Sequence, residues 1–214
     1  MDSINTFTDS LAEVDTLLEY AKKHTRTPEK YQLFNKIAII LLVTKFEVFI
    51  ENFFEEHLNR QLNSHTKDTF PEKMRYTYLE SAISKMNEFG QKTNKKDPLA
   101  KELSKLYQSS GGNLSSIRMI APSTNFPNGK HRQKDMNRLF ESHGLEGFIL
   151  RADIVSLFSQ INSCIGIRNS VIHQDAAPAL THQEVQKHKN TMLDFAYLLA
   201  ADIEMNKSAY YNEY

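Results

Sequence analysis

The chain has one cysteine, no tryptophan, seven glycines and six prolines among its 214 residues. A single cysteine, Cys164, excludes an internal disulfide and any zinc site built from several cysteines. The scarcity of glycine and proline argues against a turn-rich all-β fold and against low-complexity disorder. A chain of this length can bury a substantial core without such cross-links, so we expect an ordinary globular domain.

Neither sign of charge dominates, because 26 basic side chains balance 26 acidic ones. This balance excludes a histone-like polycation but leaves room for a local basic groove. The most apolar stretch, residues 37–50, is interrupted by polar and charged residues and is shorter than the ~20 apolar residues that cross a bilayer. The first residues show neither the basic nor the apolar region of a signal peptide. These features predict a cytoplasmic protein without a membrane partner.

Apolar residues recur at helical spacing along the first half of the chain, which predicts helices rather than strands. A first helix should run to about Lys23. Thr27-Pro28 has the pattern of a helix start, and a helix from there to about Leu62 would be about 50 Å long. Pro71 should open a third helix, and Asp97-Pro98 a fourth, after a polar linker at 92–96. No strand-like alternation occurs, so the fold class is all-α, as an up-and-down helical bundle.

Helix-ending and helix-starting signals also mark the second half. After an irregular connection at 121–134, a short helix should end with Gly144 as its C-cap. A long apolar helix then leads to His173. Thr181 and Glu184 form a capping box ahead of the last helix, and the tyrosine-rich tail beyond about residue 206 should fray.

The segment from Arg168 to His173 carries the best candidate chemistry. Metal-free RNA cleavage needs a group that titrates near neutrality to move a proton, which suits histidine. It also needs a fixed cation for the charge on the phosphate oxygens, which suits the planar fork of arginine. Asn169 lies four residues before His173, on the same helix face, where it could orient the imidazole or the phosphate.

Other interpretations remain open at this point. The same five-residue offset separates Arg60 from His65 and Arg138 from His143, and we interpret those pairs as accidental, with both arginines solvated near helix ends. Arg168 and His173 could likewise only satisfy carbonyls at a helix end. Cys164 should be an inert core thiol.

A basic loop provides a further candidate for phosphate contact. Lys130 and Arg132 flank a histidine there, with Lys134 close behind, and the alternative is ordinary surface charge.

Geometry adds a constraint, because five residues turn an ideal helix by about 140° beyond a full turn. One protomer alone would therefore splay Arg168 and His173 apart. A two-fold dimer could unite two copies of the segment, and the motif helix has apolar residues for both core and partner. Those residues are Leu157, Phe158, Ile161, Ile165 and Ile172.

The sequence here resembles the HEPN superfamily of helical ribonucleases, whose hallmark is R-x(4–6)-H with a polar residue after the arginine. Residues 137–148 (NRLFESHGLEGF) and 44–58 (TKFEVFIENFFEEHL) resemble elements of its RiboL-PSP-type and MAE-type branches. On this resemblance the chain is a single domain over 1–214, with core helices at about 1–65 and 145–206. Residues 66–136 would be a variable helical and loop insertion.

The resemblance implies a homodimer that cleaves RNA with no metal and no cofactor, as a prokaryotic toxin or phage-defence (abortive infection) effector. An antitoxin or another defence-system protein would then be a partner. Arg168, Asn169 and His173 match the catalytic motif, and Glu47 matches a polar residue of the cleft. A related toxin branch has a tyrosine, modified by its antitoxin, where this chain has Asp175, so that modification is not implied. The alternative is a catalytically silent helical binding module or an antitoxin-like partner.

Overall fold

A computed structural model describes residues 1–89, 93–107, 114–126, 133–173 and 179–211. Every regular element in these ranges is a helix, which confirms the all-α prediction. The elements are α1 (Asp2–Ser10), α2 (Ala12–Lys23), α3 (Pro28–Ser64), α4 (Glu72–Glu88), α5 (Thr93–Tyr107), η1 (Leu114–Ile120), α6 (Gln133–Ser142), α7 (Glu146–Ile149), α8 (Ala152–His173), α9 (His182–Met205) and α10 (Lys207–Tyr211). None of these described helices is long and apolar enough to cross a membrane.

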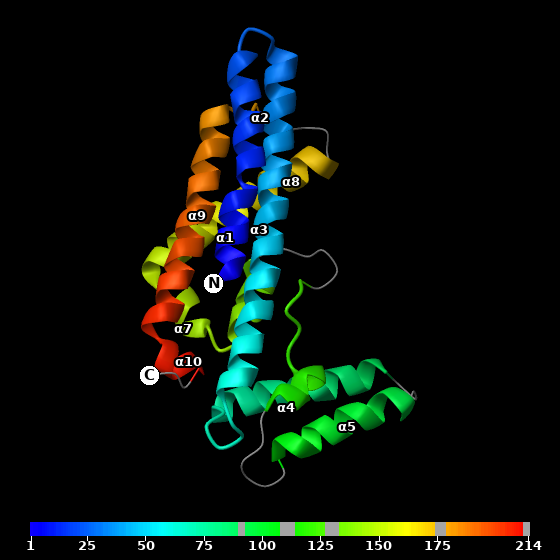
Figure 1. Ribbon diagram of the computed structural model, residues 1–214. Helices are drawn as coiled ribbons and strands as arrows, with labels where there is room; N and C mark the ends of the chain where they lie inside the picture. The colour runs from blue at the N-terminus through cyan, green and yellow to red at the C-terminus, as the bar shows by residue number, and fades with distance from the viewer. Residues whose placement is uncertain (90–92, 108–113, 127–132, 174–178, 212–214) are drawn as a thin grey trace.

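The 37-residue helix α3 is the axis of the molecule. Figure 1 shows α1, α2 and α9 running alongside it, with α8 crossing obliquely behind, while α4 and α5 lie across its lower end. At 1.5 Å per residue α3 is about 55 Å long, close to the predicted length. Thr27 and Pro28 stand at its N-cap and first position as the sequence predicts, although the Thr27 side chain makes no capping hydrogen bond.

Helices α3, α6, α7, α8 and α9 meet in one apolar cluster, which we call the first cluster. Its centre is the fully buried ring of Phe195 on α9. That ring lies 5.1 Å from Phe158 of α8 and 5.6–6.0 Å from rings of α3, α6 and α7, centroid to centroid. Edge-to-face pairs of this kind add stabilisation beyond the area they bury. This aromatic packing fixes α8, and with it the motif, against α3 and α9.

A second cluster forms at the lower end of α3. It unites Leu58 and Leu62 of α3 with apolar residues of α4, α5 and η1, Tyr78 being its largest fully buried side chain. Most of the predicted insertion, residues 66–136, therefore packs around its own core. Helix α6 belongs to the first cluster, through Met136, Leu139 and Phe140.

Two of the predicted helix boundaries are confirmed in atomic detail. Gly144 has a φ of 78°, and the amides of Gly144 and Leu145 bond back to the carbonyls of Glu141 and Phe140. That is the Schellman arrangement, in which glycine avoids the steric cost of the left-handed region. Thr181 and Glu184 form the predicted capping box at the start of α9.

Three local predictions are wrong. The first helix is interrupted at Leu11, where the Ser10 hydroxyl donates to the Phe7 carbonyl at 2.7 Å and competes with the helical pattern. Helix α5 begins at Thr93 and includes Pro98 as its sixth residue, where the missing N–H costs the helix one backbone hydrogen bond. The tail does not fray at Tyr211, whose ring is fully buried at the end of α10.

Candidate active site around Arg168 and His173

Arg168 is held inside the fold by Glu47. One terminal nitrogen of the guanidinium, Nη2, donates to both carboxylate oxygens of Glu47, at 2.7 and 2.8 Å. The two side chains are only 15% and 11% exposed. Helix α8 thus places Arg168 toward α3, across 121 positions of sequence, in a charge-assisted contact of the strong kind. The Nε atom of Arg168 is buried without a hydrogen-bond partner among the described residues.

Glu47 is the uppermost of three carboxylates spaced one turn apart on α3. Glu51 accepts the backbone N–H of Phe126 at 2.9 Å, and Glu55 pairs with Arg118. The lower two carboxylates therefore hold the connection between η1 and α6. Burial raises the pKa of Glu47, and the positive charge of Arg168 acts in the opposite direction. Removing Arg168 would leave this carboxyl buried without its counter-charge.

Asn169 and His173 lie on a different side of α8 from the arginine's contact with α3. The Asn169 Oδ1 accepts a hydrogen bond from Arg168 Nη1 at 3.0 Å. His173 is exposed at the last residue of α8 and makes no hydrogen bond to Asn169 or Arg168. The continuous helix thus keeps Arg168 and His173 apart, as the predicted splay requires, and Asn169 touches the arginine rather than the imidazole.

Cys164 lies one turn before Arg168 and is fully buried in the first cluster. Burial raises the pKa of its thiol to about 12, and Arg168 lowers it only in part. A thiol held protonated in this way is a poor nucleophile. The prediction that Cys164 is a core residue is confirmed.

The other two Arg–His pairs have histidines built into the fold. His65 and His143 are both buried, and the Nε2 atom of His65 lies 3.0 Å from the carbonyl oxygen of Tyr210. The expectation of a solvated Arg60 is wrong, since Arg60 is half-buried over the ring of Tyr211. Arg138 is exposed, as expected.

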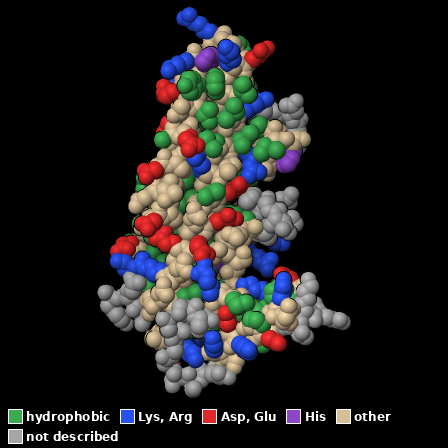
Figure 2. Space-filling model, turned by 45° about the vertical axis from the view of Figure 1, so that its right-hand side comes forward, with side chains coloured by type: hydrophobic (Ala, Val, Ile, Leu, Met, Phe, Trp, Pro, Cys, Tyr) green, Lys and Arg blue, Asp and Glu red, His purple; other side chains and the backbone are tan. Residues whose placement is uncertain are grey.

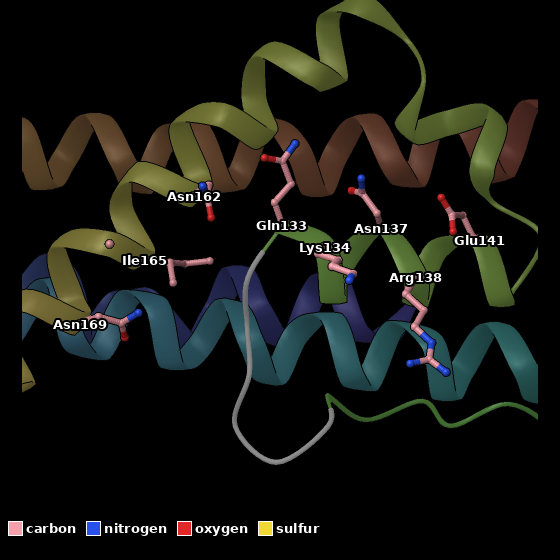
Figure 3. A pocket seen from close by; sticks show the side chains of 9 residues that line it. Gln133, Lys134, Asn137, Arg138, Glu141, Asn162, Ile165 and Asn169 are labelled. Carbon is pink, nitrogen blue, oxygen red and sulfur yellow. The ribbon is translucent and has the colours of Figure 1, made fainter. Parts of the chain in front are cut away.

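An open groove of about 860 Å³ runs between α6 and α8 and ends at Asn169. Figure 3 shows Asn169 at one end and Glu141 at the other, with Lys134 and Arg138 on the α6 side. Sequence reasoning missed this groove, although one signal was available. Asn162, Gly166, Asn169 and His173 are spaced by four, three and four residues, which places them on a single helix face.

Metal ligands do not gather anywhere in the described part of the chain: no group of three or more His, Cys, Asp or Glu side chains could hold an ion there. Lys130, Arg132 and Asp175 lie outside the described residues. The described residues therefore present one half-buried, carboxylate-held arginine, one exposed histidine and a groove that ends at Asn169, which contacts the arginine.

Comparison with protein families identifies a match over most of the chain. The model of the family described as RiboL-PSP-HEPN matches residues 5–205. No curated protein and no solved structure matches the chain.

Proposed function

The chain belongs to the RiboL-PSP-HEPN family, and on that premise we propose that it is a metal-independent endoribonuclease that uses Arg168, Asn169 and His173. HEPN domains are typically ribonucleases. The observation that carries the proposal is the placement of the motif: a guanidinium fixed by Glu47 lies five residues along α8 from an exposed histidine, and Asn169 between them in sequence lines the end of a groove.

The chemistry uses the RNA itself as nucleophile. His173 accepts the proton of a 2′-hydroxyl, and the 2′-oxygen attacks the adjacent phosphorus. The bond from phosphorus to the 5′-oxygen breaks, and a second imidazole, from another copy of the chain, returns a proton to that oxygen. The products carry a 2′,3′-cyclic phosphate and a 5′-hydroxyl.

Arg168 stabilises the charge that grows on the phosphate oxygens. Its Nη2 hydrogens are engaged by Glu47 and one Nη1 hydrogen by Asn169. The Nε atom is buried, so the second Nη1 hydrogen is the one that remains for the phosphate. Glu47 and Asn169 thus act as positioning residues for a guanidinium whose orientation matters more than its charge alone.

A dimer supplies the second motif. Of the five apolar residues expected to serve core and partner, only Ile172 is exposed, because the others are buried or half-buried within the protomer. Three exposed apolar side chains lie together on one face of α3, where Leu33, Ile37 and Val48 are 53%, 40% and 49% exposed. Figure 2 shows hydrophobic side chains gathered over the upper half of this helix.

Further along α3, toward its C-terminus, the chain segment between η1 and α6 covers the same face and is bound there by Glu51 and Glu55. Val48 adjoins Glu47 in sequence, and Ile172 lies one turn beyond Arg168, so this bare face borders the motif. We therefore place the two-fold contact on it, with the two Arg168–Asn169–His173 sets around a shared cleft.

Cleavage of RNA in EDTA tests the enzyme. The wild-type protein should cut single-stranded RNA in EDTA, and His173→Ala should lose roughly 100-fold or more, the scale of general acid–base catalysis. Arg168→Lys should also be badly impaired, because lysine keeps the charge and loses the planar fork. Cleavage that stops in EDTA, or that persists in His173→Ala, would overturn the mechanism.

Light scattering together with the cleavage assay tests the dimer. Ile37→Glu places a charge in the proposed contact and should give a monomer that no longer cuts RNA. Ile83→Glu, on an exposed isoleucine of α4, is the matched control and should change neither property. A wild-type monomer of about 25 kDa that still cuts RNA would refute the composite site.

The biological setting that fits this activity is a prokaryotic toxin or phage-defence effector in the cytoplasm, restrained by an antitoxin or another defence-system protein. Induction of the wild-type chain should slow host growth, and induction of His173→Ala should not.

A second candidate function also has one observation in its favour. Both oxygens of Glu47 already neutralise Arg168, which suits a catalytically silent module that binds a protein partner through the bare face of α3. Such a module would bind without cutting RNA and without slowing growth.

A further inference from the structure

The groove between α6 and α8 has a chemical character of its own. Two cations, Lys134 and Arg138, project from α6, and neither has an ion-pair partner within the described ranges. Side-chain amides of Gln133, Asn137 and Asn162 line the groove beside them. The single carboxylate in the lining, Glu141, lies at the end away from Asn169, as Figure 3 shows. Cations beside amide groups suit a ligand that carries both phosphates and hydrogen-bonding bases.

Gly166 exposes the helix backbone on the α8 side of the groove. A glycine inside a helix costs up to about 1 kcal/mol relative to alanine. Nothing in the described chain requires it, because a Cβ built at Gly166 has no neighbour within 4 Å. The space that a side chain would fill is the groove itself. A glycine at such a position allows a ligand to approach the backbone closely.

The α8 wall of the groove leads directly to the motif. Asn162, Gly166 and Asn169 line the groove, and His173 follows on the same helix face. The rise from Asn162 to His173 is about 16 Å. A ligand that lies along this wall and passes Asn169 arrives at the proposed general acid–base residue.

We infer that the α6–α8 groove binds a single-stranded RNA segment of a few nucleotides next to the scissile phosphate. Lys134 and Arg138 contact its phosphates, the amides contact its base edges, and the strand passes closest to α8 at Gly166. A single strand fits this lining because paired bases already use the edges that amides would contact. The inference rests on the proposed function, since it names the form of the substrate that the motif receives.

Binding measured without cleavage tests the groove. In the His173→Ala protein, the dissociation constant for a fluorescent 12-nucleotide single-stranded RNA is measured in EDTA by anisotropy, over a range of salt concentrations. Arg138→Ala and Lys134→Ala, each added to this background, should weaken binding about 5- to 10-fold. Each should also reduce the slope of log Kd against log salt by about 0.7, the value for one lost phosphate contact on a single strand.

Gly166→Leu tests close approach in the same assay. It should fill the groove and weaken binding at least 10-fold, while the melting temperature stays equal or rises because leucine favours helix over glycine. The matched control is Gly147→Leu on α7, where an added Cβ also meets nothing within 4 Å and which lies outside the groove.

A control for charge comes from a second open groove of about 580 Å³, which Lys187 of α9 lines and whose lining includes no residue of α8. Lys187→Ala should leave RNA binding unchanged. The inference is overturned if the Lys134, Arg138 and Gly166 variants bind the RNA as tightly as the His173→Ala parent. It is also overturned if they lose no more affinity than the Lys187 and Gly147 controls. Tighter binding of a hairpin duplex than of the single strand would also overturn it.

The two proposals can fail separately. A wild-type protein that cuts RNA while the groove variants bind normally would refute the groove and leave the ribonuclease intact. A protein that binds single strands through the groove but never cuts them would refute the ribonuclease and leave the groove.

Discussion

Acid should destabilise this protein through two histidines that are buried without charge. His57 of α3 lies with its Nδ1 atom 2.6 Å from the Tyr211 hydroxyl and its Nε2 atom 3.2 Å from the carbonyl oxygen of His143. His143 places its Nδ1 atom 2.9 Å from the Leu139 carbonyl oxygen. Burial lowers the pKa of His57 to about 3, with His143 and Arg60 adding to the shift, and lowers the pKa of His143 to about 4.

The direction of the effect follows from these lowered values. An unfolded histidine titrates near 6.5, so between that pH and the folded pKa the unfolded chain binds more protons than the folded one. At pH 7 the two buried histidines do not lower the free energy of unfolding. As the pH falls below about 6.5, that free energy therefore decreases. At pH 5 each histidine costs roughly 2 kcal/mol, and the two together roughly 4 kcal/mol, a large share of an ordinary folding free energy.

Urea unfolding followed by circular dichroism at pH 7 and pH 5 measures this loss. His57→Gln keeps an acceptor for Tyr211 and a donor for the His143 carbonyl but cannot titrate. In the double variant His57→Gln/His143→Gln the difference between the two pH values should shrink by most of those 4 kcal/mol. His24→Gln, at the C-cap of α2 and outside this buried pair, is the matched control. A wild-type stability that is flat between pH 7 and 5, or a double variant as acid-sensitive as the wild type, would refute the reasoning.

Substitutions at Glu47 and Gly144 give two further predictions. Glu47→Gln should lower the free energy of unfolding by about 2 kcal/mol, because a neutral acceptor replaces the counter-charge of a largely buried guanidinium, and RNA cleavage should fall with it. Glu51→Gln, one turn along α3, should cost less stability in the same urea titration and leave cleavage intact. Gly144→Ala should cost about 1–2 kcal/mol, because a Cβ at a φ of 78° is strained and would lie 3.0 Å from Met74 Sδ. A melting temperature equal to that of the wild type would contradict this account of the α6 C-cap.

Local signals in the sequence were enough to predict most of the helices. Pro28, Gly144 and the Thr181–Glu184 pair each mark a boundary through the chemistry of one turn, and all three lie where expected. The start of α5 was mispredicted because Pro98 was interpreted as a first helical residue, whereas the helix tolerates it one turn later. The burial of Tyr211 depends on His57, 154 positions away, and no local pattern contains that information.

The candidate site, like the fold, could be predicted from the sequence only in part. The motif spacing identifies Arg168, Asn169 and His173 as candidates, and the helix turn predicts that arginine and histidine point apart. The hydrogen-bond partner of Arg168 depends on the tertiary structure and cannot be inferred from local spacing. Glu47 is identified as a candidate through a family resemblance. The α6–α8 groove forms between two helices that are not neighbours in sequence, so its cations and its bare glycine face each other only once the first cluster has set the helices in place.

Within the described residues, α3 is the one element with side chains in both hydrophobic clusters. The first cluster takes no side chain from α4 or α5, while the second depends on Leu58 and Leu62 at the far end of the same rod. Substitutions in α4 and α5 can therefore accumulate without loosening the packing that sets Arg168 against Glu47. Apart from Lys73 and Met74, which reach the corner between α6 and α7, the lower cluster can therefore be repacked while the packing around Arg168 stays as it is.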